Sequence, residues 1–348
     1  MSSSTPSDRS SARPFHDVRM RGFQDRSEVA DVIGLLNSRL AALPAETIDL
    51  HLAAHRVLAA DVRSEAAVPG FHRAAMDGYA LRGSETFGAS PYGPLELEVI
   101  GVALPARAFA GSLGPGQAVR IMTGAPIPEG ADAVLQAEAA EEADGRVRVT
   151  ESVPPGRHVG RRGEDIEPGS RVLQTGRVLR PQDLGVLASI GVGRVFVVRQ
   201  PTVALIVTGD ELLPCGSRPE DYRIVDSNSV MLAALVCRDS GIAGVARLVP
   251  DQYDAVKSAI LDADADVTMV SGGSSVGQED HAPRVLAEVG ELCVHGVALR
   301  PASPTGLGFL KGRPVFLLPG NPVSCLCAYD LFAGPAIRRL GGRSLALR

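Results

Sequence analysis

The sequence predicts an α/β protein in which a three-layer α/β/α domain with a mostly parallel sheet follows a small β domain and an N-terminal helical segment. Three patterns carry this prediction. Residues 26–40 have apolar side chains at helical spacing. Residues 71–150 contain brief apolar runs divided by Gly and Pro, which favours short strands. Beyond residue 200, apolar strands alternate with helices, which is typical of a parallel sheet covered on both faces.

The first half of the chain divides into a helical part and a β part. The helix over residues 26–40 and a second apolar helix that begins at Pro181 indicate a helical and linker domain. We assign it residues 21–68 and 155–195, with a small β domain of residues 69–154 inserted. The strands of the β domain are expected at residues 79–81, 95–100, 118–122, 133–136 and 146–150.

Residues 196–345 are assigned to the α/β domain. Its helices are expected over residues 228–239, 251–261 and 285–289 and from Pro322 onward. Ligands bind at the carboxyl ends of the strands in such sheets, so the turns after the strands are the candidate site. The strands themselves are expected at residues 203–207, 245–249, 267–270 and 315–318.

Length and composition exclude several classes of protein. The 348 residues suit two or three domains, and 45% hydrophobic residues suffice for buried cores. A net charge of −5 without long charged blocks, and the absence of Trp, argue against a nucleic-acid partner. No apolar run approaches the length of a membrane span, so we expect no membrane association.

The cysteines and the N-terminus favour a cytoplasmic protein. The five cysteines are odd in number and form no CxxC pair, which fits a reducing compartment better than a disulfide framework. Residues 1–20 are rich in Ser, Pro and Arg without an apolar core. This composition predicts a disordered leader and not a signal peptide.

One predicted strand runs into a glycine-rich turn that is typical of an anion site, Ser271-Gly-Gly-Ser-Ser-Val-Gly277. Glycines can adopt positive φ and bring main-chain N–H groups close to a phosphate, and serine hydroxyls add donors. An ordinary strand-to-helix connection is the alternative. The candidate ligands in this turn are Ser271, Gly272, Gly273, Ser274, Ser275 and Gly277.

A second turn of this kind follows the last predicted strand, Leu318-Pro-Gly-Asn-Pro-Val-Ser324. Asn321 can cap the next helix with Pro322 at its first position, which leaves free N–H groups and the positive helix end directed at a ligand. A purely structural cap is the alternative. The candidate binding residues in this turn are Pro319, Gly320, Asn321 and Ser324.

Three carboxylates follow predicted strands and are expected to converge: Glu211, Asp251 and Asp280. Clustered negative charge would repel a phosphate unless a cation intervenes, so this combination implies Mg²⁺. Helix capping is the alternative for Asp251. Arg300 is a candidate oxyanion clamp, because its planar fork makes paired hydrogen bonds. No Ser–His–Asp or HExxH pattern occurs, so chemistry would depend on a metal and on positioning.

Several ordered motifs resemble one family. Beside the two turns, they are Pro69-Gly-Phe71, Ala75-Met-Asp-Gly-Tyr-Ala80, Met122-Thr-Gly-Ala-Pro-Ile-Pro-Glu-Gly130 and Thr208-Gly-Asp-Glu211. Together they resemble the MoeA family, the molybdopterin molybdenumtransferases, over nearly all of the chain after the leader. The resemblance implies insertion of molybdate into the dithiolene of adenylylated molybdopterin, with Mg²⁺-dependent cleavage of the pyrophosphate and release of AMP.

The resemblance also implies an assembly and a residue set. Family members are elongated homodimers, in which the MogA-like α/β domain of one subunit meets the N-terminal domains of the other. Expected partners are molybdopterin adenylyltransferase and chaperones of Mo enzymes. Thr123 and Asp165 match polar substrate positions of the family. The positions that match catalytic residues are Asp280, Asp251, Glu211 and Arg300, and the three carboxylates are also the expected metal ligands.

Three positions depart from the family pattern. Arg300 and Ser303 stand where the family has the lysines of Lys-Pro-Gly-Lys-Pro, and Ser274 stands where Val is common. Ser303 remains in the predicted substrate site, but the lost lysine weakens the case for molybdate binding. The short segment after Asn321 leads us to expect that the family's fourth, C-terminal β domain is absent.

Two alternative functions are kept beside molybdate insertion. One is the preceding adenylyltransferase step, which related proteins perform with the α/β module alone; the motifs within residues 71–165 argue against it. The other is a non-catalytic binding or scaffold protein that keeps the fold and the dimer, as Ser303 and the missing domain allow. The retained carboxylates and glycine turns argue against this loss of the site.

Overall fold

The computed structural model describes residues 26–273 and 280–343, and the chain divides into two compact units. Each unit is discontinuous in sequence, because the chain passes between them more than once. The first unit holds the described residues of Met1–Ala60, Thr175–Arg180 and Arg194–Arg348, and the second unit holds Asp61–Gln174 and Pro181–Gly193.

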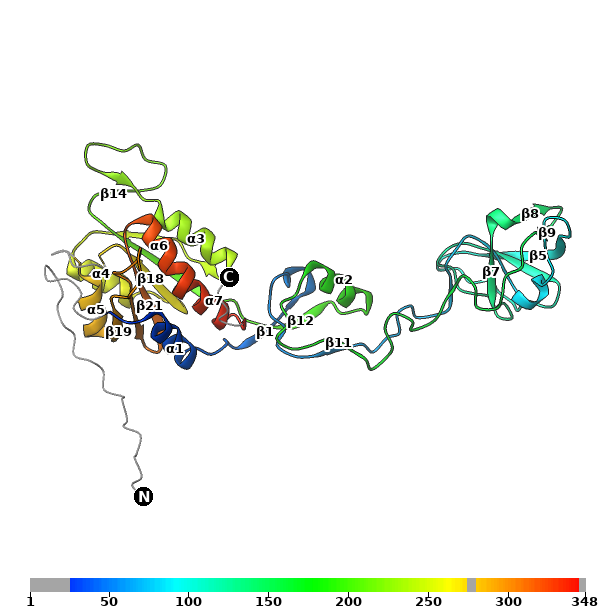
Figure 1. Cartoon of the computed structure of the whole chain (residues 1–348), viewed down its shortest axis with the longest axis horizontal. Coiled ribbons are helices and arrows are strands. Elements are labelled where there is room, and N and C mark those ends of the chain that lie inside the picture. Colours follow the sequence, from blue (N-terminus) through cyan, green and yellow to red (C-terminus); the bar gives the residue numbers. More distant parts are fainter. Residues whose placement is uncertain (1–25, 274–279, 344–348) are drawn as a thin grey trace, which may run out of the picture. The chain divides into compact units, whose positions relative to one another are not determined.

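The first unit is built on a seven-stranded sheet with the order β16-β13-β18-β21-β20-β19, in which β17 also pairs with β13 (Figure 1). Strands β16 (Ile242–Ala243), β17 (Arg247–Val249) and β18 (Val267–Ser271) pair in parallel with β13 (Thr202–Thr208). Strand β21 (Arg313–Leu318) pairs in parallel with β18. The predicted mostly parallel sheet is therefore confirmed.

Two antiparallel strands extend this sheet beyond the sequence prediction. They are β19 (Glu291–His295) and β20 (Gly306–Leu310), and β20 pairs with β21. A Cβ at Gly308 would lie 2.1 Å from the Glu291 carbonyl oxygen, so the close approach of the two strands requires glycine there. Glycine is depleted in strands generally, which is why the pattern gave no strand signal.

Helices cover both faces of the sheet and produce the predicted three layers. On one face, four helices bury apolar side chains against Leu205, Met269 and Phe316. On the other face, two helices pack against Ile206 and Val270. The first set is α1 (Val29–Arg39), α3 (Asn228–Arg238), α6 (Pro322–Ala328) and α7 (Gly334–Leu340), and the second is α4 (Tyr253–Leu261) and α5 (Ala282–Val289).

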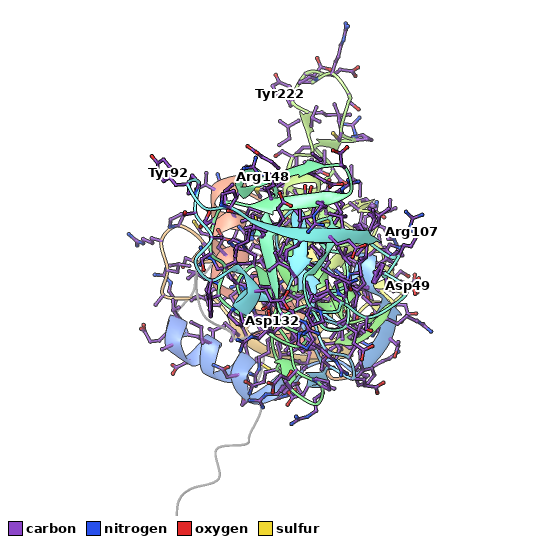
Figure 2. The ribbon with its side chains drawn as sticks, turned by 90° about the vertical axis from the view of Figure 1, so that its right-hand side faces the viewer. Asp49, Tyr92, Arg107, Asp132, Arg148 and Tyr222 are labelled. Carbon is purple, nitrogen blue, oxygen red and sulfur yellow. The ribbon has the colours of Figure 1, made fainter. Side chains whose placement is uncertain are left out.

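Smaller elements complete the first unit. Strand β1 (Ala45–Asp49) pairs antiparallel with β12 (Arg194–Val198), a 3-10 helix spans Leu50–Leu52, and a π-helix spans Tyr329–Ala333. Strands β14 (Leu212–Leu213) and β15 (Ile224–Val225) form a two-stranded ribbon. Figure 2 shows Tyr222 on the loop between these two strands, where its side chain is fully exposed.

The second unit is built on a six-stranded sheet with the order β7-β4-β6-β5-β9-β8. The five strands predicted for the β domain are present, and β8 was not predicted. Apolar clusters around Leu135 and Ile121 form separate cores. The strands are β4 (Gly78–Leu81), β5 (Leu95–Ala103), β6 (Gln117–Ile121), β7 (Ala133–Gln136), β8 (Ala140–Ala143) and β9 (Arg146–Val149).

Two short strand pairs and one α-helix also belong to the second unit. The pairs are β2 (Val62–Arg63) with β11 (Arg171–Leu173) and β3 (Arg73–Ala74) with β10 (Val159–Gly160), and the helix is α2 (Pro181–Ser189). Two 3-10 helices span Gly83–Thr86 and Ala137–Ala139. Throughout residues 26–273 and 280–343, no helix is both long enough and apolar enough to cross a membrane.

A buried ionic network holds the end of α3 against α7. The Asp239 carboxylate accepts hydrogen bonds from Arg338 Nη1 at 2.7 Å, Arg238 Nη2 at 2.8 Å and the Tyr329 hydroxyl at 3.1 Å. Burial acts to raise the pKa of Asp239, but the hydrogen bonds and charges of the two guanidinium groups outweigh it, so the pKa is lowered. The network therefore favours the folded state while Asp239 is ionised.

We predict that Asp239→Asn lowers the free energy of unfolding at neutral pH by about 3 kcal/mol, because the buried Arg338 loses its counter-charge. Urea unfolding at pH 7 measures this change. The pKa of Asp239 is lower in the folded protein, so the stabilisation is present above about pH 4 and is lost as the pH falls through the folded pKa.

The matched control for this variant is Asp330→Asn. Asp330 accepts a hydrogen bond from Arg238 at 2.6 Å, but its side chain is 46% exposed. Its loss is expected to cost less than about 1 kcal/mol. Equal losses of stability in the two variants would contradict the assigned role of the buried carboxylate.

Candidate functional site

A cavity of about 800 Å³ lies in the first unit at the carboxyl ends of β13, β18 and β21. This is the edge at which parallel strands present their following turns, as the sequence predicts. Most of the predicted α/β-domain site residues that the structure describes line it. They are Glu211, Asp251, Ser271, Gly272, Gly273, Asp280, Pro319, Gly320, Asn321 and Ser324.

The carboxylates in the cavity wall influence one another. The pKa of Asp251 is raised mainly by burial and further by the negative charges of Glu211 and Asp210. In the described part of the chain, no group of three His, Cys, Asp or Glu side chains lies close enough to hold a metal ion. The carboxylates thus concentrate negative charge without forming a complete metal cage.

The turn after β18 is fixed by its close approach to β13. Gly272 has a φ of +94°, and a Cβ there would lie 2.4 Å from the Thr208 carbonyl oxygen, so glycine is required on both counts. Its N–H donates to the Leu318 carbonyl at 3.1 Å, which ties the turn to the end of β21. Three further predicted ligands of this turn lie outside the described residues: Ser274, Ser275 and Gly277.

The turn after β21 differs from the sequence prediction in one respect. Asn321 Oδ1 accepts hydrogen bonds from the N–H groups of Val323 at 3.1 Å and Ser324 at 3.2 Å. Pro322 has no N–H group. The prediction that this helix start leaves free N–H groups for a ligand is therefore wrong for these positions, because the Asn321 cap uses them.

One side-chain amide joins the two turns. Asn228, the first residue of α3, donates from Nδ2 to the Ser271 hydroxyl at 2.9 Å and to the Gly320 carbonyl at 2.8 Å. The Ser271 side chain is fully buried, so in this structure it supports the wall. Beside it, burial raises the pKa of the Cys325 thiol to about 11, which keeps that thiol protonated and unreactive.

The second unit contains a separate pair of predicted residues, Thr123 and Asp165. Asp77 Oδ1 accepts hydrogen bonds from the Thr123 N–H at 2.6 Å and its hydroxyl at 2.7 Å. Both hydrogen bonds lower the pKa of Asp77, and the bond from the Thr123 backbone N–H has the larger effect. Asp165 lies 4.0 Å from the Arg73 guanidinium. These exposed polar groups lie near the strand β3 and the turn after β6.

Comparison with known proteins places both units in one family. Residues 27–191 match the model described as MoeA N-terminal region (domain I and II), and residues 204–339 match the model described as "Probable molybdopterin binding domain". A Mycobacterium tuberculosis protein named molybdopterin molybdenumtransferase 2 is 38% identical over 308 residues, covering 85% of this chain and 75% of the relative. The chain belongs to the MoeA family.

Other members of the MoeA family agree with this assignment. A Staphylococcus aureus molybdopterin molybdenumtransferase is 33% identical, with coverage of 90% of this chain and 76% of the relative. A crystal structure of the molybdopterin biosynthesis MoeA protein from Pyrococcus horikoshii is 34% identical, covers 92% of this chain and 81% of its own, and superposes with a TM-score of 0.78.

Two positions that depart from the MoeA pattern, Arg300 and Ser303, are not among the residues that line the cavity, and the third, Ser274, lies outside the described residues. Arg300 is exposed and does not line the cavity among the described residues. The Ser303 carbonyl accepts a hydrogen bond from the Val297 N–H at 2.8 Å, and the neighbouring Pro304 lines the cavity in its place. Both residues stay predictions as substrate ligands.

The sequence also predicts the polar turn Asp226-Ser-Asn228 as one wall of the site, but it gives Asp77 no role there. Asp77 lies inside the Ala75–Ala80 motif, directly before β4, and its partner Thr123 was already a candidate. Asp226 lies in the turn between β15 and α3, Asn228 begins α3, and both line the cavity. The pattern places them in the wall, but only the folded chain shows which of their atoms face which partners.

We predict that Glu211→Gln lowers the pKa of Asp251, because it removes one of the negative charges that disfavour ionisation of that carboxyl. An NMR titration of the Asp251 carboxyl carbon measures the change. Asp254→Asn is the control, since it removes an exposed charge from α4 that does not contribute to the shift. An Asp251 pKa that is unchanged in Glu211→Gln would contradict the coupling.

Proposed function

We propose that this protein inserts molybdate into adenylylated molybdopterin and releases AMP. The carrying observation is the cavity at the strand ends, where two glycine turns and the carboxylates Glu211, Asp251 and Asp280 meet in a chain whose relatives are named molybdopterin molybdenumtransferases. A glycine turn suits a phosphate, and grouped carboxylates suit a cation beside it. The broader role in molybdenum cofactor biosynthesis follows from membership of the family alone.

We propose Mg²⁺ as the cofactor, with its protein ligands drawn from Asp251, Glu211 and Asp280, which line the same cavity, and its other ligands from water and substrate. Mg²⁺ usually keeps several waters and takes one or two carboxylates together with substrate phosphates, so an incomplete protein cage fits this ion. Burial, together with the negative charges of Glu211 and Asp210, raises the pKa of Asp251, which supports a site where a cation would be favourable. When bound, the ion would neutralise charge on the pyrophosphate oxygens.

The chain's own residues position the substrate. Gly272 lets the turn after β18 pack against Thr208, and Asn228 holds this turn beside the turn after β21, where both line the cavity. With Mg²⁺ bound, Asp251 stays ionised, because a neighbouring cation favours the charged form of a carboxyl. Arg300 is proposed to attract molybdate, whose charge it complements.

The direct test is the release of AMP. The protein is incubated with adenylylated molybdopterin, Mg²⁺ and molybdate, and AMP is measured by chromatography. We expect molybdate-dependent AMP formation that is lost when Mg²⁺ is chelated. No release under conditions in which a known transferase is active would contradict the proposal, and ATP consumption with metal-free molybdopterin would instead favour the adenylyltransferase.

Asp280→Asn tests the proposed Mg²⁺ site. We expect the rate of AMP release to fall at least about tenfold and the Mg²⁺ concentration for half-maximal rate to rise, because a negatively charged oxygen ligand is lost. Asp254→Asn removes an exposed carboxylate outside the cavity and serves as the matched control. An unchanged Mg²⁺ requirement in Asp280→Asn would exclude that residue as a ligand.

We further propose that the protein is a homodimer in the cytoplasm. In this dimer, Thr123 and Asp165 of one subunit complete the cavity of the other. Molybdopterin adenylyltransferase is the proposed source of the substrate. Mixing the inactive variants Asp251→Asn and Thr123→Val is expected to restore about a quarter of the wild-type sites, since half of the mixed dimers' sites are intact. If the mixture stays inactive after subunit exchange, each site is made within one subunit.

A further inference from the structure

Three buried side-chain oxygens in the cavity wall have no hydrogen-bond partner among residues 26–273 and 280–343. One is the Thr208 hydroxyl, which can also donate; the other two, Oδ2 of Asp226 and Oδ1 of Asn228, can only accept. Both residues line the cavity, and they are only 4% and 6% exposed. A buried acceptor without a donor costs free energy, which a ligand recovers if it donates a hydrogen bond there.

The remaining polar atoms of the two side chains already form hydrogen bonds within the protein. The unpaired atoms alone therefore determine which groups of a ligand can bind here. Asp226 Oδ1 accepts from the Ser229 N–H at 3.1 Å. Asn228 Nδ2 faces the Gly320 carbonyl at 2.8 Å, and because a carbonyl only accepts, the amide cannot be turned the other way. Both unpaired atoms are therefore acceptors, and they call for a ligand with N–H donors.

The same cavity also offers apolar surface to a flat ring. Leu212 and Ile224 from the β14–β15 ribbon line it, as does Pro319. A site with apolar walls and a few placed acceptors suits a heterocycle that carries its donors along one edge. Neither acceptor is open to solvent, so a ligand reaches them only by entering the cavity and widening it locally.

We propose that Asp226 and Asn228 recognise the donor edge of the pterin ring. This edge presents a ring N–H next to an exocyclic amino group, two adjacent donors that match two acceptors. The edge of adenine places a ring acceptor beside its amino group, so the adenylyl end of the substrate is the poorer match. This inference rests on the proposed function, because it assigns the pterin end of that substrate to the α3 side of the cavity.

The test compares two probes, pterin and lumazine, which share the bicyclic ring but differ where lumazine has an oxo group in place of the amino group. Wild-type protein is titrated with each probe, and fluorescence or calorimetry measures binding. We expect pterin to bind roughly 10- to 100-fold more tightly, because an oxo group opposite the Asp226 carboxylate replaces a charge-assisted hydrogen bond by repulsion between acceptors.

The variant Asp226→Asn sharpens the test. Its amide oxygen can still accept from the Ser229 N–H, so its amide nitrogen then stands at the second position and offers donors to the ligand. We expect this variant to bind pterin roughly tenfold or more weakly and to lose the preference over lumazine. Asp254→Asn removes a carboxylate outside the cavity and is expected to keep the wild-type preference.

The outcomes separate this inference from the proposed function. Equal affinities of the wild-type protein for the two probes, or no binding of pterin at millimolar concentration, overturn the inference and need no variant to be folded. An Asp226→Asn protein that unfolds like the wild type but keeps the preference for pterin overturns it as well. AMP release by the wild-type protein is a separate measurement, and its failure would overturn the proposed function alone.

Discussion

The hydrogen bonds of the Asn228 side-chain amide are the interaction on which the candidate site depends. They connect the end of β18, through the Ser271 hydroxyl, to the turn after β21, through the Gly320 carbonyl. A further bond from the Gly272 N–H to the Leu318 carbonyl links the same two segments through the backbone. Because β18 and β21 are neighbours, these contacts hold two glycine turns at one edge of the sheet, where the cavity opens.

This arrangement explains why the carboxylates lie where they do. Asp251 follows β17 and Glu211 follows β13, and these strands pair in parallel, so their following residues are brought to the same edge. Burial raises the pKa of Asp251, the repulsion from Glu211 and Asp210 adds to the shift, and no cationic side chain among its causes opposes it. Structural carboxylates in this molecule behave differently: Asp239 is paired with two arginines, and its pKa is lowered. The contrast supports a role for Asp251 in binding and not in stability.

Much of this layout follows from the sequence because it depends on local patterns. The alternation of apolar strands and helices predicts β13, β18 and β21 and hence the edge whose cavity Glu211, Asp251 and Asp280 line. Other features depend on tertiary contacts that no local pattern encodes. The glycines of β20 concealed a strand, the Asn321 side chain proved to use the N–H groups expected to face a ligand, and the unpaired oxygens of Asp226 and Asn228 emerge only from the packed wall.

The central claim is that the cavity at the strand ends binds the pterin nucleotide. Changes in backbone amide NMR shifts on titration with AMP, the proposed product, test it most directly. The account predicts shifts at the residues after β13, β18 and β21, including Gly209, Gly273 and Gly320, which surround the cavity or adjoin its wall. Shifts confined to the six-stranded sheet of the second unit, or no shifts at saturating AMP, would contradict it.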